Sequence, residues 1–376
     1  MTHKKIVFNK PYFTGQETEY ILDAIDIGQL SGNGAYTRKC QAFFEERYSI
    51  KKGLLTTSCT HALEMSAVLL NLQPGDEVIL PSYTFVSTAN AFALKGAKLR
   101  FIDSRPDHPG MDEEAIESLI TPKTKLIVPV HYAGVACDMD PIMEVAKKHG
   151  VYVVEDAAQA IDSFYKGRSL GSIGQMATFS FHETKNVISG EGGLIAINDD
   201  QWVERSEIVW EKGTNRSAFF RGEIDKYGWV DLGSSYLPSE MIAAFLYAQL
   251  QNLEAIQSRR AEIWNLYWEG LKDLNDKVRM PVIPDYATNN YHMFYLVCDS
   301  LKQRSELIKF LKEENIHAVF HYQSLHQSDY FKDKHDGRDL SNCDRYSSCL
   351  VRLPFYAALE KDEQLRVIER IRKFYL

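Results

Sequence analysis

The sequence predicts an α/β protein with a large domain at residues 1–250, built on a mostly parallel sheet, and a smaller α+β domain at residues 251–376. Two observations support this prediction. From residue 51 to about 160, short β-like runs rich in Val, Ile and Leu alternate with helical stretches, as expected for strands that are covered on both faces. After about residue 280 the pattern changes to strands and helices without this regular alternation.

The alternation is clearest between residues 53 and 158. We expect strands at 53–58, 77–83, 98–103, 125–132 and 151–158, with helices between them at 59–72, 85–97, 111–120 and 140–150. Gly150 is a typical helix stop. Strands and helices at this spacing predict crossover connections and helices on both faces of the sheet.

Later elements follow a different pattern. We expect strands at 177–181 and 192–198, a helix near 201–212 and an irregular segment at 213–236. A long helix at 239–271 is expected to bridge the two domains. The smaller domain is expected to contain strands 291–297 and 317–322, helix 305–315 and a terminal helix within 360–374.

Composition and charge exclude several classes of protein. The chain has 376 residues, 45% of them hydrophobic, and a net charge of −8, which argues against nucleic acid or an anionic membrane as the main partner. No run approaches the roughly 18 apolar residues of a membrane helix, and the first residues do not resemble a signal peptide. The six cysteines show no zinc-binding spacing, so we expect no metal site and free thiols in a reducing cytoplasm.

Polar residues follow several of the expected strands, at the edge where open parallel sheets bind ligands. Ser58, Cys59 and Thr60 lie where a helix begins, so they predict a phosphate site or, equally well, an ordinary helix cap at Ser58. Asp156 ends a strongly apolar strand, where a carboxylate needs a positive partner, either a core Arg or Lys or a protonated heterocycle. Gln159 lies about one helical turn further on.

The stretch "ATFSFHETKNVISGEGG" places one lysine, Lys185, between an apolar strand and a glycine cluster. Because strand side chains alternate, Thr178, Ser180 and His182 share a polar face, which predicts a cleft or simple solvent exposure. The glycines after Lys185 favour a cleft, since they let the backbone approach a ligand closely. The role of His182 stays open between contact with substrate and support of the strand.

Together these residues match the requirements of pyridoxal 5′-phosphate (PLP). This cofactor needs a lysine for its aldehyde, a carboxylate for its ring nitrogen and a cradle for its phosphate, which Lys185, Asp156 and Ser58–Thr60 with Ser180 provide. Phe85 is placed to stack on the ring, although a core phenylalanine is an equally good interpretation of that residue alone. The chain lacks a Gly-rich dinucleotide motif and a P-loop.

These stretches also resemble a known family. "TSCTHALEM", "GDEVILPSYTFVSTANA", "VPVHYAG", "VVEDAAQ", "FSFHETKN" and "GEGG" are similar to the DegT/DnrJ/EryC/StrS sugar-nucleotide aminotransferases, PLP enzymes of fold type I. The resemblance runs from about residue 50 to 326, with weaker matches in "DLGSSYLPSEMIAA" and "VFHYQSLH" and a family-like opening in "FNKPYFTGQE".

The resemblance implies a role for each matching residue. Lys185 matches the Schiff-base lysine, Asp156 the carboxylate on the ring nitrogen and Gln159 the partner of the ring hydroxyl, while Phe85 matches the stacking aromatic. Ser58, Cys59, Thr60 and Ser180 match the phosphate cradle. Many relatives have an asparagine at the position of Ser235 that reaches the cofactor of the neighbouring subunit, and the shorter serine weakens that expectation here. Lys185 favours transamination over dehydration, because the dehydratases of the family have histidine at this position.

The implied reaction is transamination of dTDP-4-keto-6-deoxy-D-glucose with L-glutamate, with the galacto product favoured, as in the synthesis of enterobacterial common antigen. The resemblance also implies at least a homodimer. Candidates for binding the sugar nucleotide are Lys10, Arg216, Arg221, His321 and Tyr322, although solvated charges or structural residues are common alternatives at such positions. A 3-keto substrate, the gluco product and a non-catalytic PLP-binding regulator remain open.

Overall fold

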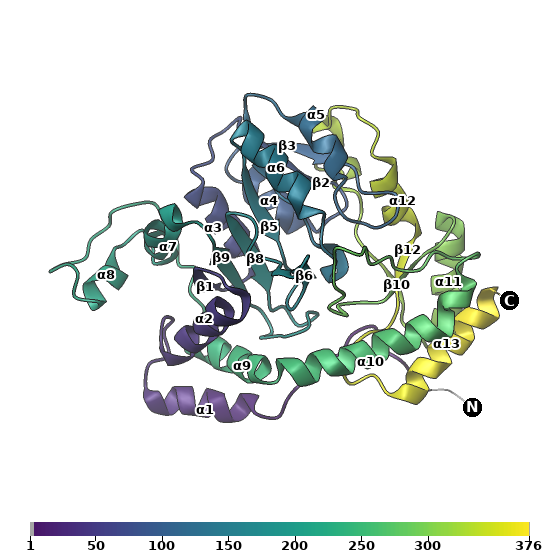
Figure 1. Cartoon of the computed structure of the whole chain (residues 1–376). Helices are drawn as coiled ribbons and strands as arrows, with labels where there is room; N and C mark the ends of the chain where they lie inside the picture. The colour runs from purple at the N-terminus through teal and green to yellow at the C-terminus, as the bar shows by residue number, and fades with distance from the viewer. Residues whose placement is uncertain (1–3, 376) are drawn as a thin grey trace.

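The computed structural model describes residues 4–375 and contains the predicted mostly parallel sheet (Figure 1). Its strands lie in the order β1-β9-β8-β5-β4-β2-β3. They are β1 (Lys52–Thr56), β2 (Glu77–Pro81), β3 (Lys98–Ile102), β4 (Thr124–Ile127), β5 (Tyr152–Asp156), β8 (Met176–Ser180) and β9 (Gly193–Ile197). Only β9 is antiparallel to its neighbours, β1 and β8, so the predicted sheet is confirmed.

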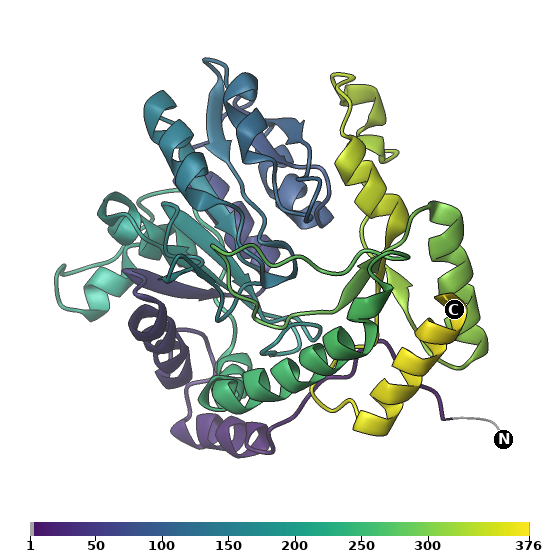
Figure 2. The same ribbon diagram turned by 45° about the vertical axis from the view of Figure 1, so that its right-hand side comes forward.

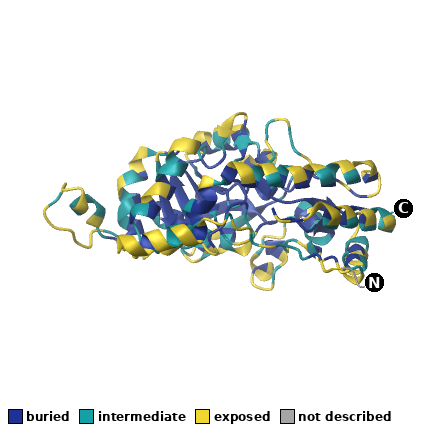
Figure 3. Cartoon of the chain, turned by 90° about the horizontal axis from the view of Figure 1, so that it is seen from below, coloured by how far each residue is buried: buried dark blue, intermediate teal, exposed yellow. Residues whose placement is uncertain are grey.

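Helices cover both faces of this sheet because successive strand residues point to opposite sides. On β5, Val153 belongs to one apolar cluster and Val154 to another. The first cluster includes α2 (Ala35–Tyr48), α5 (Ile116–Leu119), α6 (Met139–His149) and α9 (Glu240–Gln251); the second includes α3 (Cys59–Leu69), α4 (Val86–Ala93) and α7 (Val203–Trp210). In Figure 3 the strands form the buried centre between these layers. Gly150 ends α6 in the left-handed conformation, as predicted.

A second, antiparallel sheet is formed by the C-terminal part of the chain (Figure 2). Its strands, in the order β10-β12-β11, are β10 (Tyr295–Val297), β11 (Val319–Phe320) and β12 (Leu350–Arg352). The surrounding helices are α10 (Leu253–Leu271), α11 (Leu301–Glu313), α12 (Ser341–Cys349) and α13 (Lys361–Tyr375). Ile6 pairs with Ile316 and joins the apolar cluster of this sheet. The domain boundary at residues 250 and 251 stays a prediction.

Three elements differ from the expectation. The long helix at 239–271 is two helices, because Asn252 leaves the helical conformation and its side chain donates to the backbone oxygen of Ala248 at 2.9 Å. The strands expected at 291–297 and 317–322 are shorter, since Tyr291 and Tyr322 have φ values of 56° and 52° that interrupt an extended strand. Helix α1 (Glu17–Ile27), which packs on α9, had not been predicted.

The irregular segment at 213–236 forms an arm that projects away from the sheet and contains α8 (Arg216–Phe220) (Figure 1). Phe220 and Trp229 in this arm are 67% and 80% exposed. The remaining short elements are β6 (Phe164–Tyr165), β7 (Arg168–Ser169) and the 3₁₀ turns Glu113–Ala115, Tyr132–Gly134, Asp200–Trp202, Lys272–Leu274, Leu325–Gln327 and Lys332–Lys334. Within residues 4–375, no helix combines the length and apolar character needed to cross a membrane.

Candidate active site

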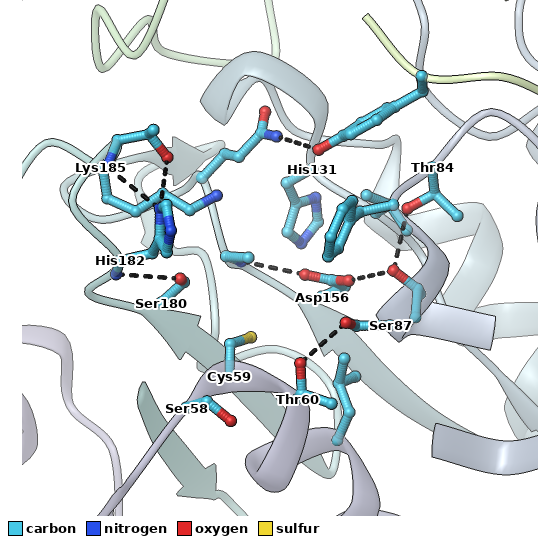
Figure 4. Close-up of a pocket in the computed structure, with 18 of the residues that line it drawn as sticks. Ser58, Cys59, Thr60, Thr84, Ser87, His131, Asp156, Ser180, His182 and Lys185 are labelled. Atoms are coloured by element: carbon cyan, nitrogen blue, oxygen red, sulfur yellow. Dashed lines mark hydrogen bonds between the residues drawn. The ribbon is translucent and has the colours of Figure 1, made fainter. Parts of the chain in front are cut away.

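A cavity of about 380 Å³, here called the Lys185 cavity, opens beyond the carboxyl ends of β2, β5 and β8 (Figure 4). This is the edge at which parallel sheets bind ligands. The cavity brings together most of the predicted site residues, namely Ser58, Cys59, Thr60, Phe85, Asp156, Gln159, Ser180, Lys185, His321 and Tyr322. Lys10, Arg216, Arg221 and Ser235 do not line it.

Lys185 follows β8 in a tight turn, in which its backbone N–H donates to the oxygen of His182 at 2.9 Å. The His182 ring supports this turn, because its Nδ1 accepts the backbone N–H of Thr184 at 3.3 Å. The side chain of Lys185 is half-buried, and burial lowers its pKa to about 8, although nearby Cys59 and Asp156 act in the opposite direction. The turn therefore presents an amine that loses its proton more readily than a surface lysine.

Asp156 ends β5 and is only 5% exposed. Thr88 Oγ1 donates to its Oδ2 at 2.7 Å, and the backbone N–H of Ala158 donates to its Oδ1 at 3.1 Å. Across residues 4–375, no Arg or Lys forms an ion pair with this carboxylate, although Lys185 lies close enough for the charge of Asp156 to act on its amine. The carboxylate is thus held in a fixed orientation and left available for a cationic partner in the cavity.

The start of α3 forms a cradle of donors (Figure 4). Ser58 Oγ caps the helix by accepting the N–H of His61 at 3.1 Å, and Thr60 Oγ1 donates to Ser87 Oγ at 2.8 Å. Among the residues that the structure describes, the backbone N–H groups of Cys59 and Thr60 have no protein partner. Free N–H groups at a helix start, next to hydroxyls, suit a phosphate.

The glycine cluster supports this cradle from behind instead of lining the cavity, which corrects the expectation that it approaches a ligand. A Cβ atom added to Gly193 on β9 would lie 2.4 Å from the backbone nitrogen of Cys59 and 2.5 Å from the carbonyl carbon of Ser58. Gly190 makes the turn with a φ of 79°. Within this cluster, Glu191 is the residue that lines the cavity. Gly193 therefore allows α3 to begin close against the sheet.

The wall of the cavity opposite this cradle is formed by residues from both sheets' surroundings, the larger and the smaller. Gln159 Oε1 accepts the N–H of Ala133 at 2.6 Å, and its Nε2 donates to the hydroxyl of Tyr322 at 3.1 Å. Phe85 is 54% exposed, and its ring centroid lies 6.0 Å from that of Tyr322. His321 Nδ1 lies 2.6 Å from the Tyr132 hydroxyl. Tyr322 and His321 therefore connect the smaller sheet to the cavity.

Sequence reasoning missed four functional candidates in this cavity: Thr88, His131, His292 and Arg352. His131, His292 and Arg352 are polar residues within or next to an apolar strand-like run, for example Arg352 in "CLVRLPF", and that contrast was the available signal; Thr88 lies in the expected helix 85–97 and had no such signal. His131 is buried and bonds through Nε2 to Glu155 at 3.0 Å, so it serves the frame of the site. The guanidinium of Arg352 forms no hydrogen bond or ion pair with any residue at 4–375, and burial lowers its pKa.

The remaining predicted residues lie outside the Lys185 cavity of their own chain. Ser235 and Arg216 line a second cavity of about 680 Å³ at the base of the arm, together with Arg38 and Lys212. Arg221 forms ion pairs of 2.7 Å with both Glu207 and Glu223. Lys10 lies on the other side of the Lys185 loop, in a small crevice near Glu183. Ser235 pairs with Glu211 at the base of the arm, whereas Arg216 begins α8 and Arg221 ends it, and none of the three lines the Lys185 cavity.

Comparison with known proteins gives a consistent result. Residues 11–372 match the model of the DegT/DnrJ/EryC1/StrS aminotransferase family. The chain is 33% identical to the GDP-perosamine synthase of Caulobacter vibrioides over 318 residues, which cover 83% of each chain. It superimposes on the aminotransferase TlmJ of Streptoalloteichus hindustanus with a TM-score of 0.91, 28% identity and 99% coverage of both chains. The PLP form of the putative sugar aminotransferase Spr1654 of Streptococcus pneumoniae gives a TM-score of 0.90, 25% identity and 99% coverage of both.

Proposed function

The chain belongs to the DegT/DnrJ/EryC1/StrS aminotransferase family, and we propose that it transfers an amino group from L-glutamate to C4 of dTDP-4-keto-6-deoxy-D-glucose. Its cofactor is PLP, as expected from the sequence. The product that we favour is dTDP-4-amino-4,6-dideoxygalactose. The observation that carries the proposal is the presence of Lys185, Asp156 and the start of α3 in one cavity.

The residues of the cavity fit this cofactor. Asp156 would hold the ring nitrogen in its protonated form, Phe85 would stack on the ring, and the N–H groups of Cys59 and Thr60 would bind the phosphate. Ser180 and the hydroxyl pair of Thr60 and Ser87 add donors beside that phosphate. When bound, PLP supplies an aldehyde for Lys185 and a ring that accepts electrons from the reacting carbon.

Lys185 is suited to move protons at the reacting carbon. With a pKa of about 8, about a quarter of its amine is neutral at pH 7.5, compared with about 0.1% at the ordinary value of 10.5. A neutral amine can both bond to a carbonyl carbon and accept a proton. Burial of the side chain is the main cause of this lowered pKa.

Arg352 supports an amino donor that bears a carboxylate. Its half-buried guanidinium lines the cavity and lies 4.8 Å from the centre of the Phe8 ring, without an acidic partner among residues 4–375, so an anionic ligand would stabilise it. Guanidinium groups bind carboxylates with two parallel hydrogen bonds. We propose that Arg352 binds a carboxylate of L-glutamate. The same carboxylate would leave Arg352 when the donor departs as 2-oxoglutarate.

The arm supports a site shared between two subunits. The second cavity contains Arg38, Lys212 and Arg216 next to Ser235, so it offers positive charge for a pyrophosphate group. We propose that this face of one subunit meets the sugar nucleotide in the Lys185 cavity of its partner within a homodimer. The exposed Phe220 and Trp229 on the arm suit contact with a second copy.

We place this reaction in the cytoplasm, in the synthesis of deoxyamino sugars for enterobacterial common antigen, O-antigen or lipopolysaccharide. The Lys185 residue supports transamination over the dehydration seen when histidine occupies this position. A 3-keto sugar, the gluco product and a non-catalytic PLP-binding role are the outcomes against which the proposal is tested.

The decisive experiment mixes the PLP-loaded protein with L-glutamate and then with dTDP-4-keto-6-deoxyglucose, and identifies the product by NMR. We expect a 4-amino sugar with galacto configuration, and no product with the 3-keto isomer. Lys185→Ala should abolish turnover, while Lys166→Ala, which removes an exposed lysine paired with Asp140, should leave it unchanged. Turnover by Lys185→Ala at the normal rate would show that the central assignment is wrong.

A further inference from the structure

A buried hydrogen-bond chain begins at the residue that follows Lys185. Asn186 is buried, and its Nδ2 donates to the backbone oxygen of Asn290 at 2.9 Å and to Gln257 Oε1 at 2.8 Å. A backbone oxygen can only accept, so the amide orientation of Asn186 is fixed. Its Oδ1 must therefore act as the acceptor in the remaining contact of this side chain.

That remaining contact is His292 Nδ1, at 2.7 Å. Because Asn186 Oδ1 accepts, Nδ1 must carry a hydrogen, and the neutral ring then has a lone pair at Nε2. His292 is 3% exposed and lines the Lys185 cavity. Within residues 4–375, Nε2 has no hydrogen-bond partner. The fold thus fixes a histidine tautomer with an unused acceptor.

The surroundings keep this imidazole neutral. Burial, followed by the positive charge of Lys185, holds the pKa of His292 well below its usual value. The titratable and charged groups around the pair are Cys59 on α3, His131 after β4, Asp156 on β5, His182 and Glu191 on either side of Lys185, Arg260 on α10, His321 and Tyr322 after β11, and Arg352 on β12. Neither Arg260 nor Arg352 has an acidic partner among the described residues, so this end of the cavity disfavours a further positive charge.

We propose that His292 is a positioning residue for Lys185, accepting a hydrogen bond from its ammonium group through Nε2. When Lys185 takes a proton from the reacting carbon, its new positive charge lies near the Arg352 guanidinium. A neutral acceptor stabilises that ammonium without the large effect on its pKa that a second carboxylate would have. This inference rests on the role of Lys185 in the proposed function.

Two substitutions separate the nitrogens of His292. In His292→Asn the side-chain amide can replace Nδ1 and keep the bond to Asn186, but nothing replaces Nε2. In His292→Gln the amide reaches the position of Nε2 and the bond to Asn186 is lost. The pKa of Lys185 is measured in the full chain freed of PLP, as the pH dependence of its labelling by acetic anhydride, followed by mass spectrometry.

We expect His292→Asn to lower the pKa of Lys185 by about one unit, the size expected for one lost hydrogen bond to a charged group, and His292→Gln to change it much less. An unchanged pKa in His292→Asn would overturn the proposal, as would equal shifts in both variants. If His292→Gln lowered the pKa of Lys185 more than His292→Asn did, His292 would have a purely structural role through Asn186, which also contradicts the proposal.

A measurement on the unaltered histidine protects the test against misfolded variants. In the PLP-free protein with ¹⁵N-labelled histidine, Nε2 of His292 should lack a hydrogen, and its NMR signal should shift when Lys185→Met removes the donor. No shift would refute the contact. Neither measurement uses turnover, so failure of the proposed reaction, judged by its product, is distinguishable from failure of this inference.

Discussion

Substitution of Gly193 by alanine tests how closely α3 must approach the sheet. The added Cβ would lie 2.4 Å from Cys59 N, 2.5 Å from Ser58 C and 2.7 Å from Ser58 O. Non-bonded heavy atoms prefer about 3.5 Å, so the start of the helix must move by about 1 Å. All three contacts are backbone atoms, which cannot rotate away as a side chain can.

This movement should affect both stability and PLP binding. Overpacking of this kind costs about 1–3 kcal/mol of unfolding free energy, visible as a lower melting temperature. The displaced N–H groups of Cys59 and Thr60 should lose part of their bonding to phosphate. At about 1.5–3 kcal/mol for a hydrogen bond to a charged group, we expect PLP to bind about 10–100-fold more weakly in fluorescence titrations of the PLP-free protein.

The neighbouring glycine provides the matched control. A Cβ on Gly192 meets the hydroxyl oxygen of Ser189 at 2.4 Å, but its next neighbours are atoms of Phe181 at 3.5 Å. The Ser189 hydroxyl can rotate, so Gly192→Ala should keep PLP affinity within about threefold of the original protein. If Gly193→Ala binds PLP as tightly as Gly192→Ala does, the assignment of the α3 start as the phosphate cradle is refuted.

Three further predictions concern side chains of the same cavity. Thr88→Val removes the 2.7 Å bond to Asp156 and should lower turnover about tenfold while PLP stays bound; an unchanged rate in Thr88→Val would count against a role in orienting the carboxylate. Arg352→Met should raise KM for L-glutamate about 10–100-fold without changing KM for the sugar, and equal effects on both substrates would contradict carboxylate binding. In PLP-free protein, burial lowers the folded-state pKa of Lys185 to about 8 from 10.5, so the unfolded chain binds more protons between these values. The contribution of Lys185 should therefore increase the free energy of unfolding, measured in urea, as pH rises from about 8 to about 10.5. Lys185→Met should lack this increase, and identical pH profiles of the two proteins would be inconsistent with a buried amine.

The sequence could predict the sheet and the residues at its strand ends because both follow from local pattern. Asp156 is the last residue of an apolar strand and Lys185 lies in the turn that follows another, and the ends of parallel strands meet at one edge. The alternation in "ATFSFH" likewise placed Phe179 and Phe181 in the core, where both are 1% exposed. The roles assigned to these site residues stay predictions, since position alone does not establish chemistry.

Other parts of the site depend on long-range packing that local pattern does not encode. Arg352 and His292 reach the cavity because the smaller sheet lies against the end of the larger one. His321 and Tyr322 were singled out, but the positive φ of Tyr322, which ends β11, appears only in the folded chain. The role of Gly193 rests on its close contact with the start of α3, and no pattern in the sequence other than the glycine itself indicates that contact.

The arm shows how structure separates residues that the sequence treats alike. Arg216 and Arg221 were equal candidates for the pyrophosphate, but Arg221 is bound to Glu207 and Glu223. A phosphate at Arg221 would have to displace two carboxylates and would leave them close to its own negative charge. Arg216 lies over the Phe220 ring at 5.0 Å and forms no ion pair with residues 4–375, so its guanidinium can bind an anion without such a loss. Arg216 is therefore the stronger of the two candidates for binding the pyrophosphate in the proposed homodimer.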